Sequence, residues 1–189
     1  MILFFLIFRQ FTQLRVQSAA AASNGEKFTV GICQLVQHAA LDAATQGFED
    51  ALTASFGENV TFDFQNAQGD SNTCSTIINS FVSNKVDLIL ANATPALQAA
   101  AAGTSDIPIL GTSVTEYGVA LGLDDFDGTV GGNISGTADL APLDQQAAML
   151  NELFPDAKNV GILYCSSEPN SIYQSTTLRM EKEEIDILC

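Results

Sequence analysis

Apolar and polar residues in the first third of the chain predict a β-strand followed by an α-helix. The apolar run 28–35 is rich in β-branched and aromatic residues and does not alternate, as in a strand covered on both faces. After a polar turn at Gln37 and His38, apolar residues return at helical spacing, namely Leu41, Ala44, Phe48, Ala51 and Leu52. This order of strand, turn and helix is half of a βαβ unit.

The same pattern recurs along the chain. Further strands are predicted at 60–64, 86–91 and 107–111, and the first of these is expected near a sheet edge because its alternate residues are polar. A second helix is expected to begin at Asp70, Ser71 or Asn72 and to run to Asn84. Its predicted inward side consists of Cys74, Ile77, Ile78, Phe81 and Val82.

Small polar residues follow each predicted strand. Thr94 and Pro95 predict the start of a third helix, with the Thr94 hydroxyl as its cap and an alanine-rich body from 96 to 103. Because the carboxyl ends of parallel strands meet at one edge of the sheet, these loops should converge there. The predicted binding edge consists of Gln37, His38, Gln68, Gly69, Asn92 to Thr94 and Thr112 to Thr115.

The chain divides by pattern into a nearly complete lobe and the beginning of a second. We predict an α/β fold with a Rossmann-like parallel sheet lobe at 27–118, a glycine-rich crossover or hinge at 119–140, and an incomplete second α/β lobe at 141–189. The second lobe should contain a helix at 143–154 and a buried strand at 159–164. Only 25 residues follow Tyr164, so a truncated second lobe is expected.

Residues 1–26 are predicted to be a signal-like or disordered segment outside the fold. Eight apolar residues are too few to span a bilayer but fit the core of an export signal, and small residues at 18–22 offer a cleavage site. The signal is irregular, because Arg9 and Arg15 follow the apolar run and no lipobox cysteine is present. An extracytoplasmic, exported protein is therefore the expectation.

Charge and motif content exclude several classes of function. The formal net charge is -15, and between residues 28 and 178 the cations are Lys85 and Lys158 against 17 carboxylates, which argues against nucleic acid or anionic membrane as partners. GxGxxG, GxxxxGK[ST] and GxSxG are all absent, so we expect no enzyme, no catalytic residues and no cofactor. The four cysteines have no metal-site spacing, so no metal is expected; Cys33 and Cys165 are predicted as small buried residues, and a disulfide between them stays open.

From about residue 28 to 174 the sequence resembles the extracytoplasmic substrate-binding proteins of ABC transporters, of the type I periplasmic-binding fold, in the branch linked with tryptophan and tyrosine uptake. The segments that carry the resemblance are Val30-Gly31-Ile32, Gln37 to Ala44, Gln46-Gly47-Phe48, Gln65 to Asp70, Asn92 to Ala96, Ser113 to Thr115, Gly132 to Asp139 and Glu168 to Ser171. The resemblance implies a two-lobed clamp that closes on a small ligand and delivers it to a membrane permease. The stretch 176–189 does not resemble the expected continuation, as in an altered reading frame.

An amino acid ligand needs donors for its carboxylate and acceptors for its ammonium group. The free amides at the start of the Pro95 helix, with the Thr94 hydroxyl, would supply the donors, and Asp139 or Glu168 the acceptor. Plain helix capping is the alternative for Thr94 and for Asp139. The further candidates are Gln37, His38, Gln68, Asn92, Ser113, Thr115, Asn170 and Ser171, with Tyr117 and Tyr164 as stacking or packing residues.

We therefore predict a solute-binding component of an ABC importer whose ligand resembles an amino acid, with an aromatic one as the leading case. Two alternatives stay open at this point. One is a truncated fragment without ligand function, and the other is a ligand-binding sensor module coupled to a receptor.

Overall fold

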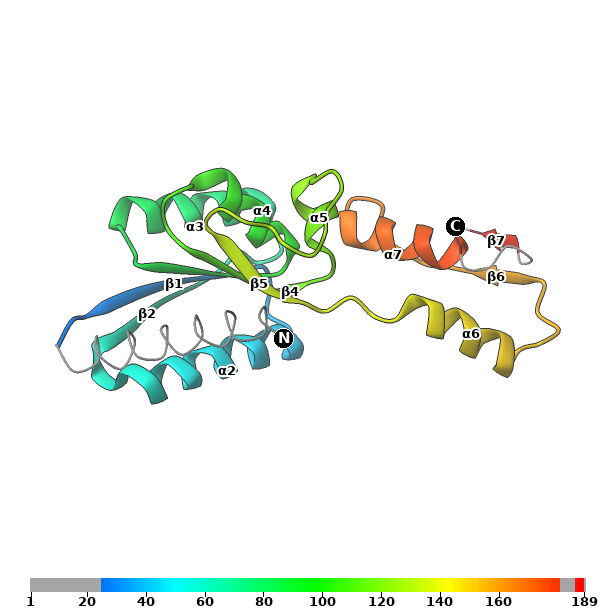
Figure 1. The fold of residues 1–189 in the computed structure, drawn as a ribbon, viewed down its shortest axis with the longest axis horizontal. Coiled ribbons are helices and arrows are strands. Elements are labelled where there is room, and N and C mark those ends of the chain that lie inside the picture. Colours follow the sequence, from blue (N-terminus) through cyan, green and yellow to red (C-terminus); the bar gives the residue numbers. More distant parts are fainter. Residues whose placement is uncertain (1–24, 181–185, 189) are drawn as a thin grey trace, which may run out of the picture.

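The computed structural model describes residues 25–180 and 186–188, and the predicted signal-like segment lies almost entirely outside the described residues. Figure 1 shows a sheet lobe and, beyond the carboxyl ends of its strands, a smaller region. The lobe is built from β1 (Phe28–Gln34), α2 (Ala39–Phe56), η1 (Gly57–Asn59), β2 (Val60–Asn66), α3 (Ser71–Asn84), β3 (Leu88–Asn92), α4 (Thr94–Gly103), β4 (Ile109–Val114), α5 (Tyr117–Leu121) and β5 (Ile134–Ala138). The smaller region contains α6 (Leu143–Leu153), β6 (Asn159–Gly161), α7 (Pro169–Met180) and β7 (Asp186–Leu188).

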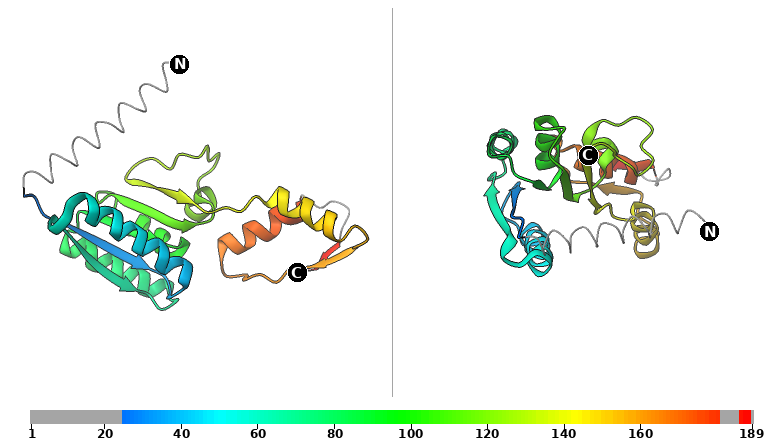
Figure 2. Two further views of the ribbon diagram at one scale, coloured as in Figure 1. Left: turned by 90° about the horizontal axis from the view of Figure 1, so that it is seen from below. Right: turned by 60° about the vertical axis from the view of Figure 1, so that its left-hand side comes forward.

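The sheet of the lobe is parallel and has the order β2-β1-β3-β4-β5, which confirms the predicted fold class. The predicted edge position of β2 is also confirmed. Because crossovers between parallel strands are right-handed, a connection that moves one way across the sheet places its helix on one face, and a connection that moves the other way places its helix on the opposite face. Accordingly α2 lies across one face, as the left view of Figure 2 shows, and α3 and α4 cover the other (Figure 1).

The two faces of the sheet have separate apolar clusters. Residues of α3 and α4, among them Phe81 and Leu97, pack with β1, β3 and β4 in the larger cluster. Phe48 and Leu52 of α2 pack on Val30, Ile32 and Leu90 in the smaller one. The ring of Phe81 lies directly on the backbone of Gly31, because a Cβ at Gly31 would be only 2.7 Å from it.

Local sequence signals set the ends of two helices in the first lobe, at Gly57 and at Asp70. Gly57 ends α2 with a positive φ of 58°, and its N–H bonds to the Thr53 carbonyl. Asp70 caps α3, since its Oδ1 accepts from the Asn72 N–H at 2.8 Å. The predicted inward residues Cys74, Ile77, Ile78 and Phe81 are all buried, and Val82 is partly buried.

The carboxyl half of the lobe differs from the prediction. The fourth strand runs from Ile109 to Val114, beyond the predicted end at residue 111, with a bulge between Gly111 and Val114 where it pairs with β5. Ser113 lies in this irregular part with a φ of 54°. The glycine-rich crossover was expected to hold a short strand at Ile134, and that strand is present as β5; it joins the first sheet as the fifth strand, so the sheet of the first lobe extends to Ala138.

The smaller region corrects two expectations. The predicted buried strand at 159–164 is only three residues long, and Leu163 is fully exposed. Cys165 is also exposed and carries a free thiol, whereas Cys33 is buried beside Cys74, and both of these are free as well. The apolar composition of residues 162–165 did not bury them, since Leu163, Tyr164 and Cys165 are all exposed. A second strand that the sequence did not predict, β7, pairs in parallel with β6.

Candidate functional site

A row of polar residues crosses the carboxyl edge of the first sheet. Gln34 is the register partner of Asn66 on one side and of Asn92 on the other, and Asn92 is in turn the partner of Thr112. Partners in register project to the same face of a sheet. Four neighbouring strands therefore end in side chains that carry hydrogen-bonding groups on the face covered by α2, and the predicted convergence of the loops is present.

Asn92, a predicted ligand residue, turns its amide toward α2. Its Nδ2 donates to the Leu41 carbonyl at 2.8 Å and to Thr45 Oγ1 at 2.9 Å. The side chain is completely buried, and its Oδ1 has no hydrogen-bond partner. Asn92 therefore fastens the start of α2 to the end of β3, and its amide nitrogen is engaged in that contact.

His38 and Gln37 lie in the exposed turn between β1 and α2. His38 is the N-cap of α2, and its Nδ1 accepts from the Ala40 N–H at 3.2 Å. A neutral imidazole that accepts at Nδ1 carries its proton on Nε2, so the outer nitrogen is a donor. The ring thus makes a local hydrogen bond through Nδ1, and its Nε2 side remains available to a ligand.

The start of α4 departs from the predicted capping arrangement. Thr94 is the first residue of the helix and not its cap; the cap position is held by Ala93, with a φ of 95° and no side-chain hydrogen bond. The first backbone bond joins the Leu97 N–H to the Ala93 carbonyl at 3.0 Å. The predicted Thr94 cap is therefore wrong by one position, because the strained Ala93 lets the helix begin earlier.

This shift leaves a polar group without a partner at the helix start. The Thr94 hydroxyl is buried and makes no hydrogen bond, and the whole residue is 3% exposed. Pro95 has no amide hydrogen, so the N–H groups of Thr94 and Ala96 are the first-turn donors without an intrahelical acceptor. A buried hydroxyl beside free amides at a helix N-terminus is an arrangement suited to a carboxylate.

The remaining candidates of the first lobe lie around the same edge. Gln68 is exposed in the loop after β2, with its N–H bonded to Asn66 Oδ1 at 2.8 Å. Ser113 is partly buried at the bulge of β4, and Thr115 is buried just beyond that strand. Thr115 Oγ1 also accepts from Gln174 Nε2 of α7 at 3.5 Å, so the smaller region reaches the edge here.

The predicted site residues from Asp139 onward differ from the prediction in several respects. Asp139 is exposed at the end of β5 and does not cap α6, whose N-cap is Pro142, so the capping alternative for Asp139 is wrong. Glu168 precedes α7 and its carbonyl accepts from Ile172 N. Ser171 Oγ accepts from Cys165 N at 3.0 Å, while Asn170 Oδ1 is buried without a partner. Tyr164 is exposed, not packed.

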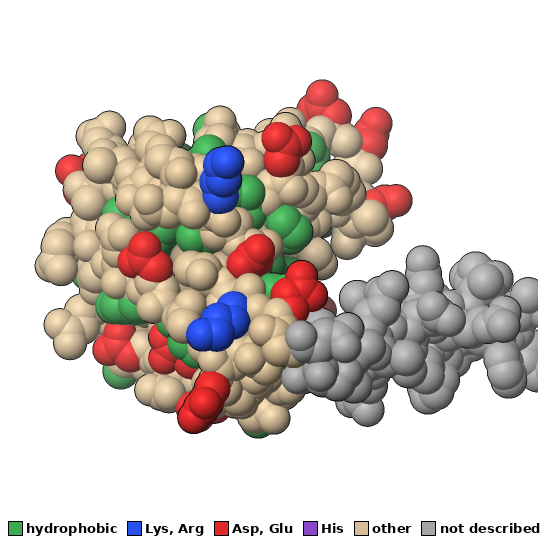
Figure 3. Space-filling view, turned by 90° about the vertical axis from the view of Figure 1, so that its left-hand side faces the viewer, with side chains coloured by type: hydrophobic (Ala, Val, Ile, Leu, Met, Phe, Trp, Pro, Cys, Tyr) green, Lys and Arg blue, Asp and Glu red, His purple; other side chains and the backbone are tan. Residues whose placement is uncertain are grey.

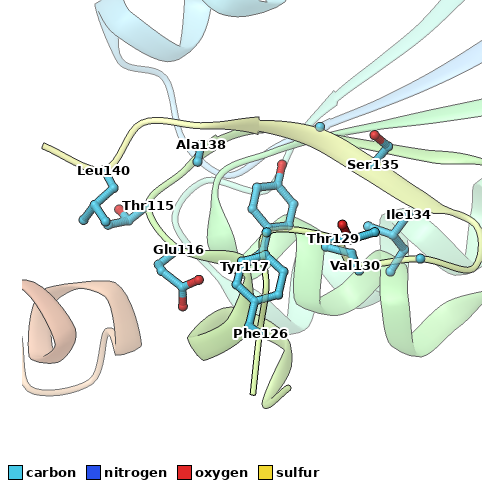
Figure 4. Close-up of a pocket in the computed structure, with 13 residues that line it drawn as sticks. Thr115, Glu116, Tyr117, Phe126, Thr129, Val130, Ile134, Ser135, Ala138 and Leu140 are labelled. Carbon is cyan, nitrogen blue, oxygen red and sulfur yellow. The ribbon is translucent and has the colours of Figure 1, made fainter. Parts of the chain in front are cut away.

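A cavity of about 520 Å³ opens beside the predicted edge and not at its centre. It lies between β5, α5 and the glycine-rich loop, and Figure 4 shows Thr115 and Leu140 at one end with Tyr117 and Phe126 in the middle. Thr115 is the one predicted ligand residue that lines it. Glu116, the carboxylate of its wall, is occupied as the cap of α5, accepting from Gly118 N at 2.9 Å and Val119 N at 2.6 Å.

Tyr117 forms the middle of the cavity wall. Its hydroxyl donates to the Thr137 carbonyl at 3.2 Å, and Gly136 is required opposite because a Cβ there would collide with the hydroxyl. Burial, and then the negative charge of Asp139, raise the pKa of Tyr117 to about 12. The ring is therefore a neutral packing and hydrogen-bonding residue that closes β5 onto α5.

We expect Tyr117 to ionise only in strongly alkaline solution, and the fold to lose stability as it does. Because the pKa of Tyr117 in the folded chain, about 12, lies above the ordinary value of 10, its contribution is complete below pH 10 and is lost between pH 10 and 12. The difference in phenolate absorbance between the chain and Tyr117→Phe during an alkaline titration measures this. A Tyr117 phenolate that forms at pH 10 would contradict the prediction.

The described residues have three further properties, which concern surface charge, metal-ligand groups and membrane-spanning helices. Figure 3 shows acidic side chains spread over the face at the amino ends of the strands, with few basic ones between them. Within residues 25–180 and 186–188, no group of three His, Cys, Asp or Glu side chains is placed to hold a metal ion. Over the same described residues, none of the helices has the length and apolar character needed to cross a membrane.

Sequence reasoning missed two residues of the edge, Gln34 and Thr45. Gln34 was read as part of an apolar strand, although it is the one polar residue near the end of that run with a long hydrogen-bonding side chain. Thr45 lies at i+4 from Leu41 and i−3 from Phe48, which places it on the inward face of α2. A threonine at such a position was the available signal for a buried polar contact.

Comparison with known proteins assigns the chain to a class. A family model described as ABC transporter substrate binding protein matches residues 29–188. The chain belongs to this family. The match extends past residue 174, to the end of the described chain. Proteins of the family are solute-binding proteins that act outside the cytoplasm with an ABC permease.

Individual relatives agree with this assignment. A tyrosine-binding protein of Clostridioides difficile (strain R20291) is 44% identical over 167 residues, which are 83% of this chain and 48% of the relative. A conserved domain protein from Vibrio cholerae has a TM-score of 0.79 and 32% identity, covering 86% of this chain and 56% of that one. An ABC domain from Streptococcus pneumoniae in complex with L-Trp has a TM-score of 0.77 and 33% identity, with the same coverage. This chain spans about half the length of these relatives.

Proposed function

We propose that the chain captures an aromatic amino acid, L-tyrosine or L-tryptophan, outside the cytoplasm for an ABC importer. The observation that carries the proposal is the start of α4, where the Thr94 hydroxyl is buried without a partner beside two free amides. The ligand carboxylate would accept from these three donors, in a position where the helix dipole favours negative charge. The names of the relatives that bind tyrosine and tryptophan support the choice of ligand.

The ammonium group of the ligand would be held by a carboxylate across the edge. Asp139 is the stronger candidate, because it follows β5 of the same sheet and its backbone N–H is bonded to the Val114 carbonyl at 3.0 Å. Gln37, His38, Gln68, Ser113 and Thr115 would supply the remaining polar contacts from the first lobe. Glu168, Asn170 and Ser171 would approach from the smaller region, near the point where Gln174 of α7 already contacts Thr115.

Different parts of the chain would have different roles in ligand capture. We propose that residues 27–138 form the lobe that carries the ligand carboxylate, that 139–142 act as the hinge, and that the region from 143 onward closes on the ligand. The hinge contains Pro142, and the structure shows no helix or strand between β5 and α6. Export of the chain to the extracytoplasmic side and delivery to a permease are part of the same proposal.

Calorimetric titration of the 189-residue chain with L-tyrosine, L-tryptophan and L-leucine tests the proposal. We expect heat of binding with the two aromatic amino acids and none with leucine. A melting temperature that rises with ligand concentration should accompany it, since ligand at about 100 times Kd stabilises by about 2.7 kcal/mol.

A second reading is favoured by the fact that the chain spans about half the length of its relatives: a folded fragment without ligand function. It predicts a cooperative thermal transition that none of the three amino acids shifts. Such a result, together with the absence of heat, would contradict ligand capture by this chain.

A further inference from the structure

A buried polar cluster joins the two loops that would contact the ligand. Thr45, in the second turn of α2, is 6% exposed, although the neighbouring positions on the same helix face are apolar. Its Oγ1 donates to Gln34 Oε1 at 2.7 Å and accepts from Asn92 Nδ2 at 2.9 Å. One hydroxyl therefore links the end of β1 to the end of β3 under the first helix.

The Gln34 amide carries the linkage into the turn before α2. Its Nε2 donates to the Val36 carbonyl at 3.0 Å and to Asp42 Oδ1 at 2.6 Å. The first bond fixes the backbone one residue before Gln37, and the second fixes the first turn of the helix that His38 caps. The conformation of the exposed turn is thereby determined by a side chain that is itself 1% exposed.

Asn92 carries the linkage in the other direction. Its backbone carbonyl accepts from the Leu35 N–H at 3.2 Å, which joins the ends of β1 and β3 a second time. Asn92 also lies two residues before Thr94, with only the strained Ala93 between them. A displacement of the Asn92 side chain would therefore be transmitted to the start of α4.

We propose that Thr45 is a positioning residue for the ligand site: it acts through Gln34 and Asn92 to hold the Gln37 and His38 turn in register with the first turn of α4. This inference rests on the proposed function, because it assumes that both segments contact the ligand. Thr45 lies on the inward face of α2, against the sheet, so its role in the proposal is indirect. Its chemistry is specific, since a single group must donate to one partner and accept from the other, which only a hydroxyl of this size does.

The test compares Thr45→Val, which keeps the shape and removes the hydroxyl, with Thr45→Ser, which keeps the hydroxyl. We expect Thr45→Val to weaken L-tyrosine binding by about tenfold or more, since it removes two hydrogen bonds of the buried cluster and leaves only the longer 3.4 Å bond from Asn92 Nδ2 to Gln34 Oε1 between the ends of the two strands. Thr45→Ser should bind within about twofold of the unmodified chain, a difference well under the tenfold that follows from one lost hydrogen bond.

Controls separate positioning from general loss of stability. Ile78→Val, in the core of α3 and away from the cluster, lowers stability without touching the loops, and it should leave the affinity unchanged at a temperature well below its melting transition. Hydrogen exchange of the amides 36–42 should become faster in Thr45→Val and stay unchanged in Thr45→Ser and Ile78→Val. If Thr45→Val does not fold, Asp42→Ala, which removes the exposed acceptor of Gln34 Nε2, should weaken binding in the same direction.

The outcomes are distinct. Binding by the unmodified chain with equal affinity in Thr45→Val would overturn the positioning role and leave the proposed function standing. No binding of L-tyrosine or L-tryptophan by the unmodified chain would overturn both. Equal weakening in Thr45→Val, Thr45→Ser and Ile78→Val would assign the effect to stability alone and would also overturn the inference.

Discussion

Replacing Thr94 with valine is expected to weaken L-tyrosine binding by about 10- to 100-fold, the loss that follows from one hydrogen bond to a charged group. The same substitution should leave the ligand-free chain at least as stable as before. The Thr94 hydroxyl is buried without a partner, so it stays desolvated in the free protein and gains a partner only when a carboxylate arrives. Valine has nearly the same shape and removes that unsatisfied group.

Opposite effects on affinity and stability make this prediction specific. Calorimetry gives the affinity, and urea-induced unfolding without ligand gives the free energy of unfolding. Thr94→Ser keeps the hydroxyl and is the matched control, which should retain most of the affinity. Normal L-tyrosine binding by Thr94→Val would show that the Thr94 hydroxyl does not contact the ligand. A loss of stability in Thr94→Val would show that this hydroxyl has a structural hydrogen-bond partner in solution.

Replacing Phe81 with alanine is expected to lower the free energy of unfolding by about 3–5 kcal/mol, the range for a large aromatic residue in a packed core. Phe81 is the largest completely buried side chain in the described part of the chain, and its ring contacts the Gly31 backbone in β1, next to the edge strand β2. Gly31 cannot fill the cavity that Phe81→Ala would leave, because it has no side chain and its backbone is held between β2 and β3.

Phe64→Ala is the control for Phe81→Ala. It removes the same atoms from a ring that is 46% exposed on the edge strand β2, and its loss should be clearly smaller. Urea-induced unfolding measures both variants, and Phe81→Leu provides a milder variant if the alanine chain does not fold. Similar losses at the two positions would mean that the sheet does not pack on α3 as the structure has it.

Local sequence signals were sufficient for most of the first lobe. The run after Lys27, the glycine at position 57 and the aspartate at position 70 each act through contacts within a few residues, so their effects were readable without the fold. The position of β2 at the edge was also readable, because the polar alternate residues of that strand suit one open side.

Other features depended on partners that are distant in the sequence. Thr94 and Pro95 have the composition of a cap and a first turn, but the conformation of Ala93 moved the helix start by one residue. The run 159–164 has the composition of a buried strand, but burial requires a covering element, and β6 has only β7 beside it among the described residues. Composition gives the tendency of a segment to be covered and says nothing of what covers it.

The amino acid sequence therefore determined the class of the fold, the order of strands and helices in the first lobe, and the edge at which polar loops gather, because these follow from periodicity and from capping within single elements. Tertiary structure alone decided which polar residues at that edge are free. It turned Asn92 and Gln34 inward onto Thr45 and left the Thr94 hydroxyl without a partner. The reason is physical: the hydrogen bonds from Asn92 to Thr45 and Leu41, 47 and 51 positions away, depend on the packing of α2 on the sheet, which no local pattern records.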